Sequence, residues 1–210
     1  MIEKYKFDTM SLHSGHVPDK ETGSRAVPIY QTTSYVFKDT DEAAALYNME
    51  VGGHLYTRIS NPTIATLEQR LASLDGGVSC VACSSGMAAM HLVVTAICSS
   101  GDHIVASNKM YGANINLLQH TMTRFGIKTD FVNPNDLQEI EKSIKPNTKL
   151  VFGEVIGNPG LDVMNVPEVA KICKKKNVPL AIDATFNTPY LMKPISVSYT
   201  HLTLPTKPSG

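Results

Sequence analysis

Residues 78–97, VSCVACSSGMAAMHLVVTAI, contain two apolar runs that are separated by a turn of small residues. The first run, at 78–83, predicts a buried strand, and the second run, at 87–97, predicts a helix. The turn Ser84-Ser85-Gly86 would open this helix, so that several backbone N–H groups and the positive end of the helix dipole point at one place. Such a place suits the binding of a phosphate group.

An acidic residue ends another apolar run, PLAI at 179–182, which predicts a second buried strand that reaches Asp183. In an open α/β sheet, ligands bind in the crevice outside the carboxyl ends of the strands, which is where Asp183 would lie. A phosphate cradle and one buried carboxylate together match the needs of pyridoxal phosphate. The phosphate anchors this cofactor, and the carboxylate keeps its ring nitrogen protonated so that the ring accepts electrons.

Helical and strand patterns alternate from residue 61 to residue 183. Asn61 is placed to cap a helix, Pro62 occupies the first helical position, and Gly76 ends the helix. Beyond the elements already described, strands are predicted at 103–107, 128–132, 149–156 and 179–183, and helices at 112–125, 137–144 and 166–176. This order predicts an α/β fold, in which a mostly parallel sheet is covered by helices on both faces.

The two ends of the chain differ from this regular part. Residues 1–58 combine polar turns with short extended pieces and one helix at 41–49, and they predict an N-terminal arm that packs on something else. Residues 59–195 are predicted to form the pyridoxal-phosphate-binding domain, which is incomplete because the alternation stops there. Residues 196–210 show no helical period and no obvious strand partner, and they predict an unrelated or disordered tail.

Composition and charge exclude several classes of function. The 210 residues carry 19 basic and 19 acidic side chains, and no basic run exceeds Lys174-Lys175-Lys176, so no nucleic-acid partner is expected. No apolar stretch is long enough to span a bilayer and the N-terminus lacks a signal-peptide core, which predicts a cytoplasmic protein without a membrane partner. Cys80 and Cys83 would point to opposite faces of a strand, so no metal site is predicted.

Two more groups of residues bear on the same cofactor. Tyr56 and Arg58 are two residues apart, so on an extended segment they share a face and can grip a phosphate together. Tyr111 follows the strand that ends at Ser107, where an aromatic ring can stack on a flat cofactor. Each candidate also has a plainer interpretation: a simple strand–helix turn, a surface arginine, a packed tyrosine or a capping aspartate.

Four motifs give the chain a resemblance to a known family. They are PIYQTTS at 28–34, YTRISNPT at 56–63, SSGMAA at 84–89, and DAT at 183–185 followed by TPY at 188–190. Together they resemble the Cys/Met-metabolism family of pyridoxal-phosphate enzymes, whose fold is the fold type I of aspartate aminotransferase. The resemblance runs from about residue 12 to residue 195, and it implies the large domain of this fold in a truncated form.

The resemblance implies how the phosphate of the cofactor is held. Gly86 and Met87, after Ser85, would bind the phosphate through their backbone N–H groups. Tyr56 and Arg58 would bind the phosphate that belongs to the neighbouring subunit. The intact enzyme is therefore expected to be a homo-oligomer, namely a dimer of dimers.

The resemblance also assigns residues to the cofactor ring. Tyr111 would stack on the ring and act as a catalytic residue, and Asp183 would pair with the ring nitrogen. Asn158 would lie near the 3-hydroxyl group, and Thr185 would support the ring.

Within the family, EVIGNPG at 154–160 and YGAN at 111–114 look most like O-acetylhomoserine sulfhydrylases. This implies γ-replacement, in which O-acetylhomoserine and sulfide or a thiol give homocysteine or methionine and acetate. The alternatives are a methionine or cystathionine γ-lyase and a cystathionine γ-synthase, although Ala113 stands where methionine γ-lyases usually carry cysteine. A non-enzymatic α/β binding module is the alternative from another class.

The chain departs from the family at one position that matters for catalysis. The Schiff-base lysine of the family lies in a Ser-x-Thr-Lys segment soon after the position of Ile195, and this chain has no such segment. Lys207 stands in PTKP and lacks the flanking serine. The chain is therefore expected to be an inactive N-terminal fragment of the enzyme.

Overall fold

The computed structural model of the chain describes residues 5–196 and the backbone of 197 and 201–204. It divides into two compact units, Met1–Ala82 and Cys83–Gly210. The boundary expected after residue 58 lies inside the first unit.

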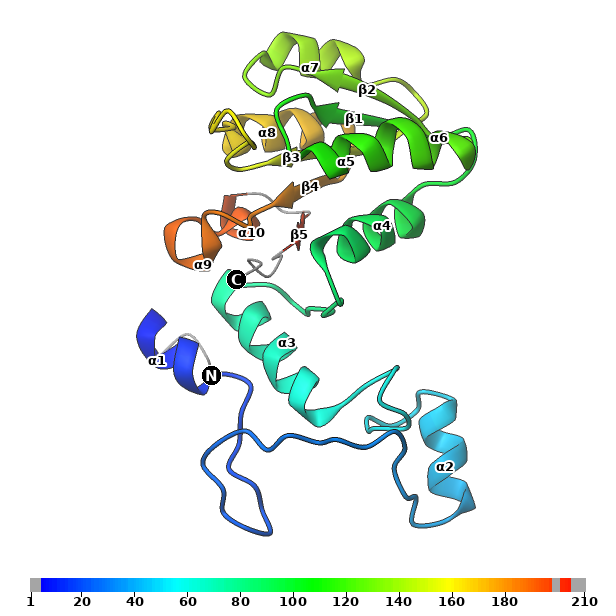
Figure 1. Cartoon of the computed structure of the whole chain (residues 1–210), viewed down its shortest axis with the longest axis vertical. Coiled ribbons are helices and arrows are strands. Elements are labelled where there is room, and N and C mark those ends of the chain that lie inside the picture. The colour runs from blue at the N-terminus through cyan, green and yellow to red at the C-terminus, as the bar shows by residue number, and fades with distance from the viewer. Residues whose placement is uncertain (1–4, 198–200, 205–210) are drawn as a thin grey trace. The chain divides into compact units, whose positions relative to one another are not determined.

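The described residues of the first unit form three helices, α1 (Phe7–His13), α2 (Thr40–Tyr47) and α3 (Pro62–Asp75) (Figure 1). Asn61 caps α3 as predicted, because its side chain accepts a hydrogen bond from the N–H of Thr63 at 2.9 Å. The buried Asn61 amide also donates to the carbonyl oxygen of Tyr30 at 2.9 Å, so the cap ties α3 to the extended segment at 28–34. Helix α1, which the sequence analysis did not predict, packs beside α3.

The strand predicted at 78–83 is wrong. This segment forms no ladder with any described residue, and Val78 and Val81 are exposed at 107% and 77%. An apolar run becomes a strand only where another strand satisfies its backbone N–H and C=O groups. Without a strand, the argument that Cys80 and Cys83 point to opposite faces no longer holds, and neither residue forms a disulfide bond with a described cysteine.

The second unit is built on a parallel sheet of five strands in the order β2-β1-β3-β4-β5. The strands are β1 (His103–Ser107), β2 (Lys128–Val132), β3 (Thr148–Glu154), β4 (Leu180–Asp183) and β5 (His201–Leu204). The first four confirm the strands predicted in this part of the chain. Their parallel arrangement brings all carboxyl ends to the same edge of the sheet.

Strand β5 corrects the expectation for the C-terminal segment. It pairs with β4 in parallel, with Leu204 opposite Asp183, so residues 201–204 do have a strand partner. Without β5, the outer edge of β4 would present unpaired backbone groups, which an extended segment can satisfy. Residues 198–200 and 205–210, and with them Lys207, lie outside the described residues.

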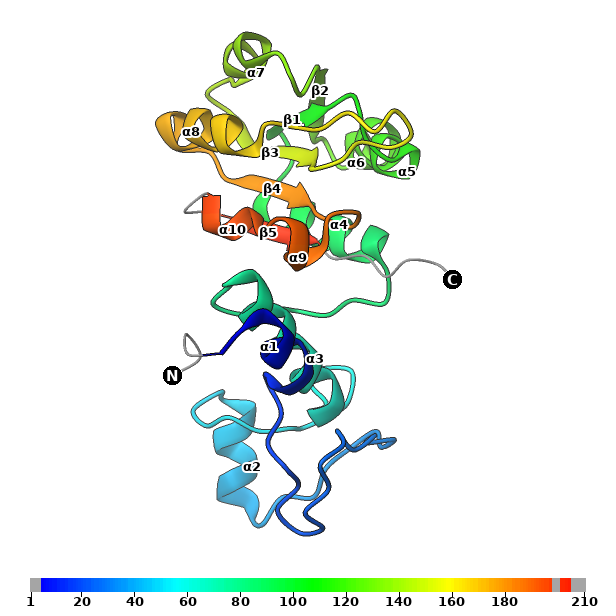
Figure 2. The ribbon, with the colours of Figure 1, turned by 90° about the vertical axis from the view of Figure 1, so that its left-hand side faces the viewer.

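Helices cover both faces of the sheet, as predicted (Figure 2). One face packs against α4 (Gly86–Ile97) and α5 (Gly112–Asn116), which continues through a π-helical turn at Leu117–Thr121 into α6 (Met122–Arg124). The other face packs against α7 (Leu137–Ser143) and α8 (Val166–Lys176). Neighbouring residues of β1 point to opposite faces of the sheet. Ile104 packs in the core on the α4 and α5 side, and Val105 packs in the core on the α7 and α8 side. The short helices α9 (Thr188–Leu191) and α10 (Pro194–Val197) follow β4.

Candidate functional site

Two carboxylates lie next to each other at the carboxyl edge of the sheet. Glu154 is the last residue of β3, Asp183 is the last residue of β4, and the parallel register pairs the two directly. Asp183 was predicted from the sequence as a site residue. Glu154 was not, although it ends an apolar strand in the same way, and the rule that identified Asp183 could have identified it.

Thr185 fixes the carboxylate of Asp183. Oδ1 of Asp183 accepts a hydrogen bond from the Thr185 backbone N–H at 2.9 Å and another from the Thr185 hydroxyl group. Burial raises the pKa of Asp183, whereas the bonds from Thr185 and from the Asn114 amide lower it. The structure thus brings together Asp183 and Thr185, which were predicted to serve the same ring.

Glu154 binds the start of α5. Its Oε1 accepts hydrogen bonds from the backbone N–H of Tyr111 at 2.7 Å and from Nδ2 of the buried Asn114 at 3.1 Å. Burial raises the pKa of Glu154 to about 7, and the charge of Asp183 adds to this rise. Hydrogen bonds from Tyr111, Asn114 and the backbone of Asn158 act in the opposite direction.

Tyr111 lies where the sequence predicted it, after the end of β1 and directly before α5. Its backbone is bound to Glu154, while its side chain is half exposed and leaves surface for a stacking partner. Asn158 lies in the loop after β3, and its backbone hydrogen bond reaches the same Glu154. Gly157 lies so close to the loop after β1 that a Cβ there would collide with the carbonyl oxygen of Lys109.

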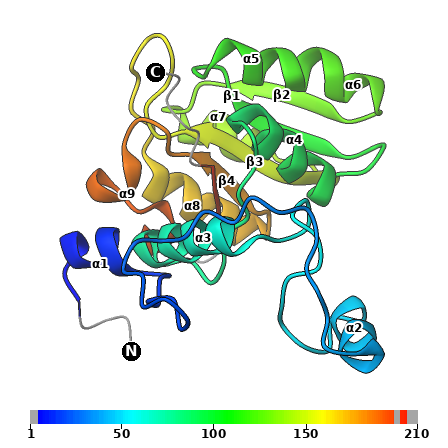
Figure 3. The ribbon, with the colours of Figure 1, turned by 60° about the horizontal axis from the view of Figure 1, so that its bottom comes forward.

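The predicted phosphate cradle forms the start of α4. Ser85 caps this helix, since its hydroxyl oxygen accepts the N–H of Ala88 at 3.1 Å, and Gly86 and Met87 are the first two helical residues. Backbone N–H groups in a first helical turn have no acceptor within the helix. Figure 3 places the start of α4 on the side of the sheet toward which the strands point, and Figures 1 and 2 agree.

Tyr56 and Arg58 belong to the first unit. The Arg58 guanidinium carbon lies 5.7 Å from the centroid of the Tyr56 ring, and both side chains are exposed. The segment is held by a bridge between Ser34 and Tyr56 and by a hydrogen bond from the N–H of Thr57 to the carbonyl oxygen of Thr33 at 2.8 Å. The two side chains therefore lie next to each other. That they bind the cofactor phosphate of a neighbouring subunit stays a prediction.

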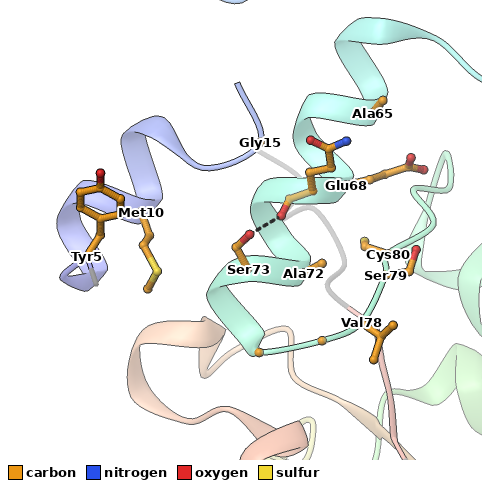
Figure 4. Close-up of a pocket in the computed structure, with 13 residues that line it drawn as sticks. Tyr5, Met10, Gly15, Ala65, Glu68, Ala72, Ser73, Val78, Ser79 and Cys80 are labelled. Atoms are coloured by element: carbon orange, nitrogen blue, oxygen red, sulfur yellow. Dashed lines mark hydrogen bonds between the residues drawn. The ribbon is translucent and has the colours of Figure 1, made fainter. Parts of the chain in front are cut away.

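A pocket of about 840 Å³ lies in the first unit between α1, α3 and the segment at 76–80 (Figure 4). Glu68 borders it, and its carboxylate accepts the N–H of Ala82 at 2.7 Å. No candidate cofactor-binding residue lines this pocket.

Two other kinds of site were sought in the described part of the chain. Among these residues, no group of three or more His, Cys, Asp or Glu side chains could hold a metal ion. None of the helices described is both long and apolar enough to cross a membrane.

Comparison with known proteins agrees with this geometry. Residues 8–199 match the family described as Cys/Met metabolism PLP-dependent enzymes. The O-acetyl-L-homoserine sulfhydrylase of Leptospira meyeri is 45% identical over 195 residues, which are 93% of this chain and 44% of that protein. The L-methionine gamma-lyase of Treponema denticola is 35% identical over 198 residues, which are 93% of this chain and 49% of that protein.

A solved structure extends the likeness to the fold. The crystal structure assigned as an O-acetylhomoserine (thiol)-lyase from Campylobacter jejuni, with N′-pyridoxyl-lysine-5′-monophosphate, matches with a TM-score of 0.90 and 37% identity. The match covers 93% of this chain and 48% of that one, so this chain spans less than half the length of each relative named here. The fold is therefore the large domain of fold type I, its cofactor is pyridoxal phosphate, and the chain belongs to the Cys/Met metabolism family of PLP-dependent enzymes.

Proposed function

We propose that the complete protein to which this chain corresponds catalyses γ-replacement on O-acetylhomoserine, with sulfide or a thiol as the second substrate. The observation that carries the proposal is the set of Tyr111, Glu154 and Asp183 at the carboxyl edge, in a chain 45% identical to an O-acetyl-L-homoserine sulfhydrylase. The products would be homocysteine or methionine, together with acetate. A cytoplasmic location and a dimer of dimers belong to the same proposal.

The chemistry of the residues at the edge fits pyridoxal phosphate. Asp183 offers a carboxylate whose orientation Thr185 fixes, which suits a protonated ring nitrogen. The first turn of α4 offers backbone N–H groups that suit a phosphate. When it is bound, pyridoxal phosphate supplies the electron sink for the reaction.

Each proposed residue then has a distinct task. Asp183 would hold a proton on the ring nitrogen, and Tyr111 would orient the ring by stacking on it. Asn158 would bind the 3-hydroxyl group, and Thr185 would keep Asp183 in place. These tasks are positioning and charge, which are what the protein contributes in a cofactor enzyme.

The phosphate would be shared between two chains. The N–H groups of Gly86 and Met87, at the helix start that Ser85 caps, would bind the phosphate of their own subunit. Tyr56 and Arg58 would bind that of the neighbour, since a guanidinium group forms strong charge-assisted hydrogen bonds to phosphate. The exposure of both side chains supports such a contact.

A second candidate function is γ-elimination by a γ-lyase, which the likeness to the Treponema denticola enzyme favours. Cystathionine γ-synthase activity belongs with it as a further alternative. We propose in addition that this chain alone is inactive, because it lacks the lysine to which the family attaches the cofactor. If the complete protein also lacked that lysine, a non-enzymatic α/β binding module would be the better interpretation.

The decisive assay uses the complete protein with its cofactor. We expect homocysteine formation from O-acetylhomoserine and sulfide to be faster than 2-oxobutyrate formation from methionine, because acetate is the better leaving group and Ala113 supplies no thiol beside Tyr111. If 2-oxobutyrate from methionine dominates, the γ-lyase alternative is correct. If neither product forms while the cofactor is bound, the proposed substrate class is wrong.

A further inference from the structure

We infer that Glu154 is a positioning residue. It holds the backbone of Tyr111 and the Asn114 side chain at the end of β3, and so sets where the Tyr111 ring and the Asp183 carboxylate lie relative to each other. The first ground is the bonding of one oxygen atom. Oε1 of Glu154 receives the N–H of Tyr111 at 2.7 Å and Nδ2 of Asn114 at 3.1 Å. A single atom thereby fixes a backbone position and a side chain of α5.

The second ground is the way in which α5 begins. Tyr111 occupies the N-cap position, but its side chain makes no capping hydrogen bond. Glu154 lies on β3, 43 residues away in the sequence, and accepts the backbone N–H of Tyr111. The placement of Tyr111 therefore depends on a group at the carboxyl edge of the sheet, and a local cap in α5 does not provide it.

The third ground is the link to Asp183. Glu154 and Asp183 are register partners on neighbouring strands, and the Asn114 amide contributes hydrogen bonds to both carboxylates. In the described part of the chain, Asp183 is the charged group that acts on Glu154, and the other contacts come from neutral donors on α5 and on the loop after β3. Tyr111, Glu154, Asn114 and Asp183 thus form one connected chain of contacts.

If position 154 only filled space, a carboxylate would be an unfavourable residue there. Burying a charge beside a second carboxylate disfavours the ionised form, and an uncharged acceptor would avoid that cost. What an uncharged apolar residue could not do is bind the N–H of Tyr111. The N–H of Tyr111 needs a hydrogen-bond acceptor at position 154. A residue that only filled the core would not have to supply one.

The first test measures amide hydrogen exchange at Tyr111 in the ligand-free 210-residue chain. We expect slow exchange in the wild type and in Glu154→Gln, which keeps an acceptor oxygen, and roughly tenfold faster exchange in Glu154→Ala. The amide protons of β1 serve as the internal reference. Glu168→Gln, at a partly exposed glutamate of α8, is the matched control. Unchanged exchange at Tyr111 in Glu154→Ala, with β1 protected, would overturn the inference.

A second variant keeps the test decisive if Glu154→Ala does not fold. Glu154→Asp withdraws the acceptor by one methylene group and should accelerate exchange at Tyr111 relative to Glu154→Gln. Equal exchange in these two variants would contradict the positioning role.

The second test follows binding of pyridoxamine 5′-phosphate by fluorescence, because this analogue has no aldehyde to react with surface lysines. The consequence for the cofactor rests on the proposed function, whereas the exchange experiment does not. We expect roughly tenfold weaker binding in Glu154→Ala than in Glu154→Gln. If exchange changes but binding does not, the positioning role stands and the proposed placement of the cofactor ring is wrong.

Discussion

At the scale of single residues, Glu154 should make the stability of the chain depend on pH. Its pKa of about 7 lies above the ordinary value of 4.5, so between these values the folded chain binds more protons than the unfolded chain. The free energy of unfolding should therefore fall as pH rises through this window, by on the order of 1–3 kcal/mol.

Glu154→Gln removes the titrating group and should flatten this slope. Urea unfolding of the wild type and of Glu154→Gln at several pH values from 4.5 to 7.5 measures the slope. Glu168→Gln, at a partly exposed glutamate, is the control. The opposite result would be a free energy of unfolding that rises with pH in the wild type relative to Glu154→Gln. It would show that Glu154 is ionised in the folded chain, contrary to our expectation.

At the scale of elements, the cap of α4 gives a prediction that concerns one helix. Ser85→Ala removes the hydrogen bond to the N–H of Ala88 and should lower the free energy of unfolding by about 1 kcal/mol. Thr95→Ala is the control for the loss of a hydroxyl group. Thr95 is exposed within α4, and its hydroxyl group donates to the carbonyl oxygens of His91 and Leu92 in the preceding turn. Thermal melting followed by circular dichroism distinguishes them, and equal losses in the two variants would speak against the cap.

The elements also show what a sequence reveals and what it leaves open. The apolar runs of β1 and β3 could be predicted because they are bounded by turns and alternate with helices, which is enough to indicate a parallel sheet. The run at 78–83 has the same local character, yet it forms no strand, because pairing depends on a partner elsewhere. Strand β5 is the reverse case, since the alternation in HLTL at 201–204 is only four residues long and indicates no partner, and its pairing depends on the edge of β4.

The candidate site likewise contains residues that could be predicted from the sequence and one that was not. Asp183 and Tyr111 could be placed from the sequence, because the carboxyl ends of parallel strands are known to meet at one edge. Glu154 satisfied the same condition, but its importance lies in a bond to the backbone of Tyr111, and a backbone bond leaves no trace in the identity of the residue it joins.

At the scale of the whole molecule, the proposal that this chain lacks the attachment lysine can be tested chemically. The chain is incubated with pyridoxal phosphate, reduced with borohydride and mapped by peptide mass spectrometry. We expect no stoichiometric pyridoxyl adduct on any single lysine, because no lysine of this chain stands in a Ser-x-Thr-Lys segment. Lys207→Arg and Lys193→Arg are the matched controls, and a stoichiometric adduct on Lys207 that only the first removes would refute the proposal.

The π-helical turn at Leu117–Thr121 has a consequence for changes in chain length. Asn114, Leu118 and Met122 are four residues apart and all buried, a spacing that drifts around a regular helix of 3.6 residues per turn. The wider turn compensates for that drift, so the residue that binds Glu154 and the two core residues stay in line. Deleting one residue within 117–121 would leave seven steps of about 100° between Asn114 and Met122, which is nearly two full turns, so a regular helix would keep both side chains on one face. A single deletion would thus remove the wide turn and leave the Asn114 side chain, which reaches both carboxylates, on nearly its present face.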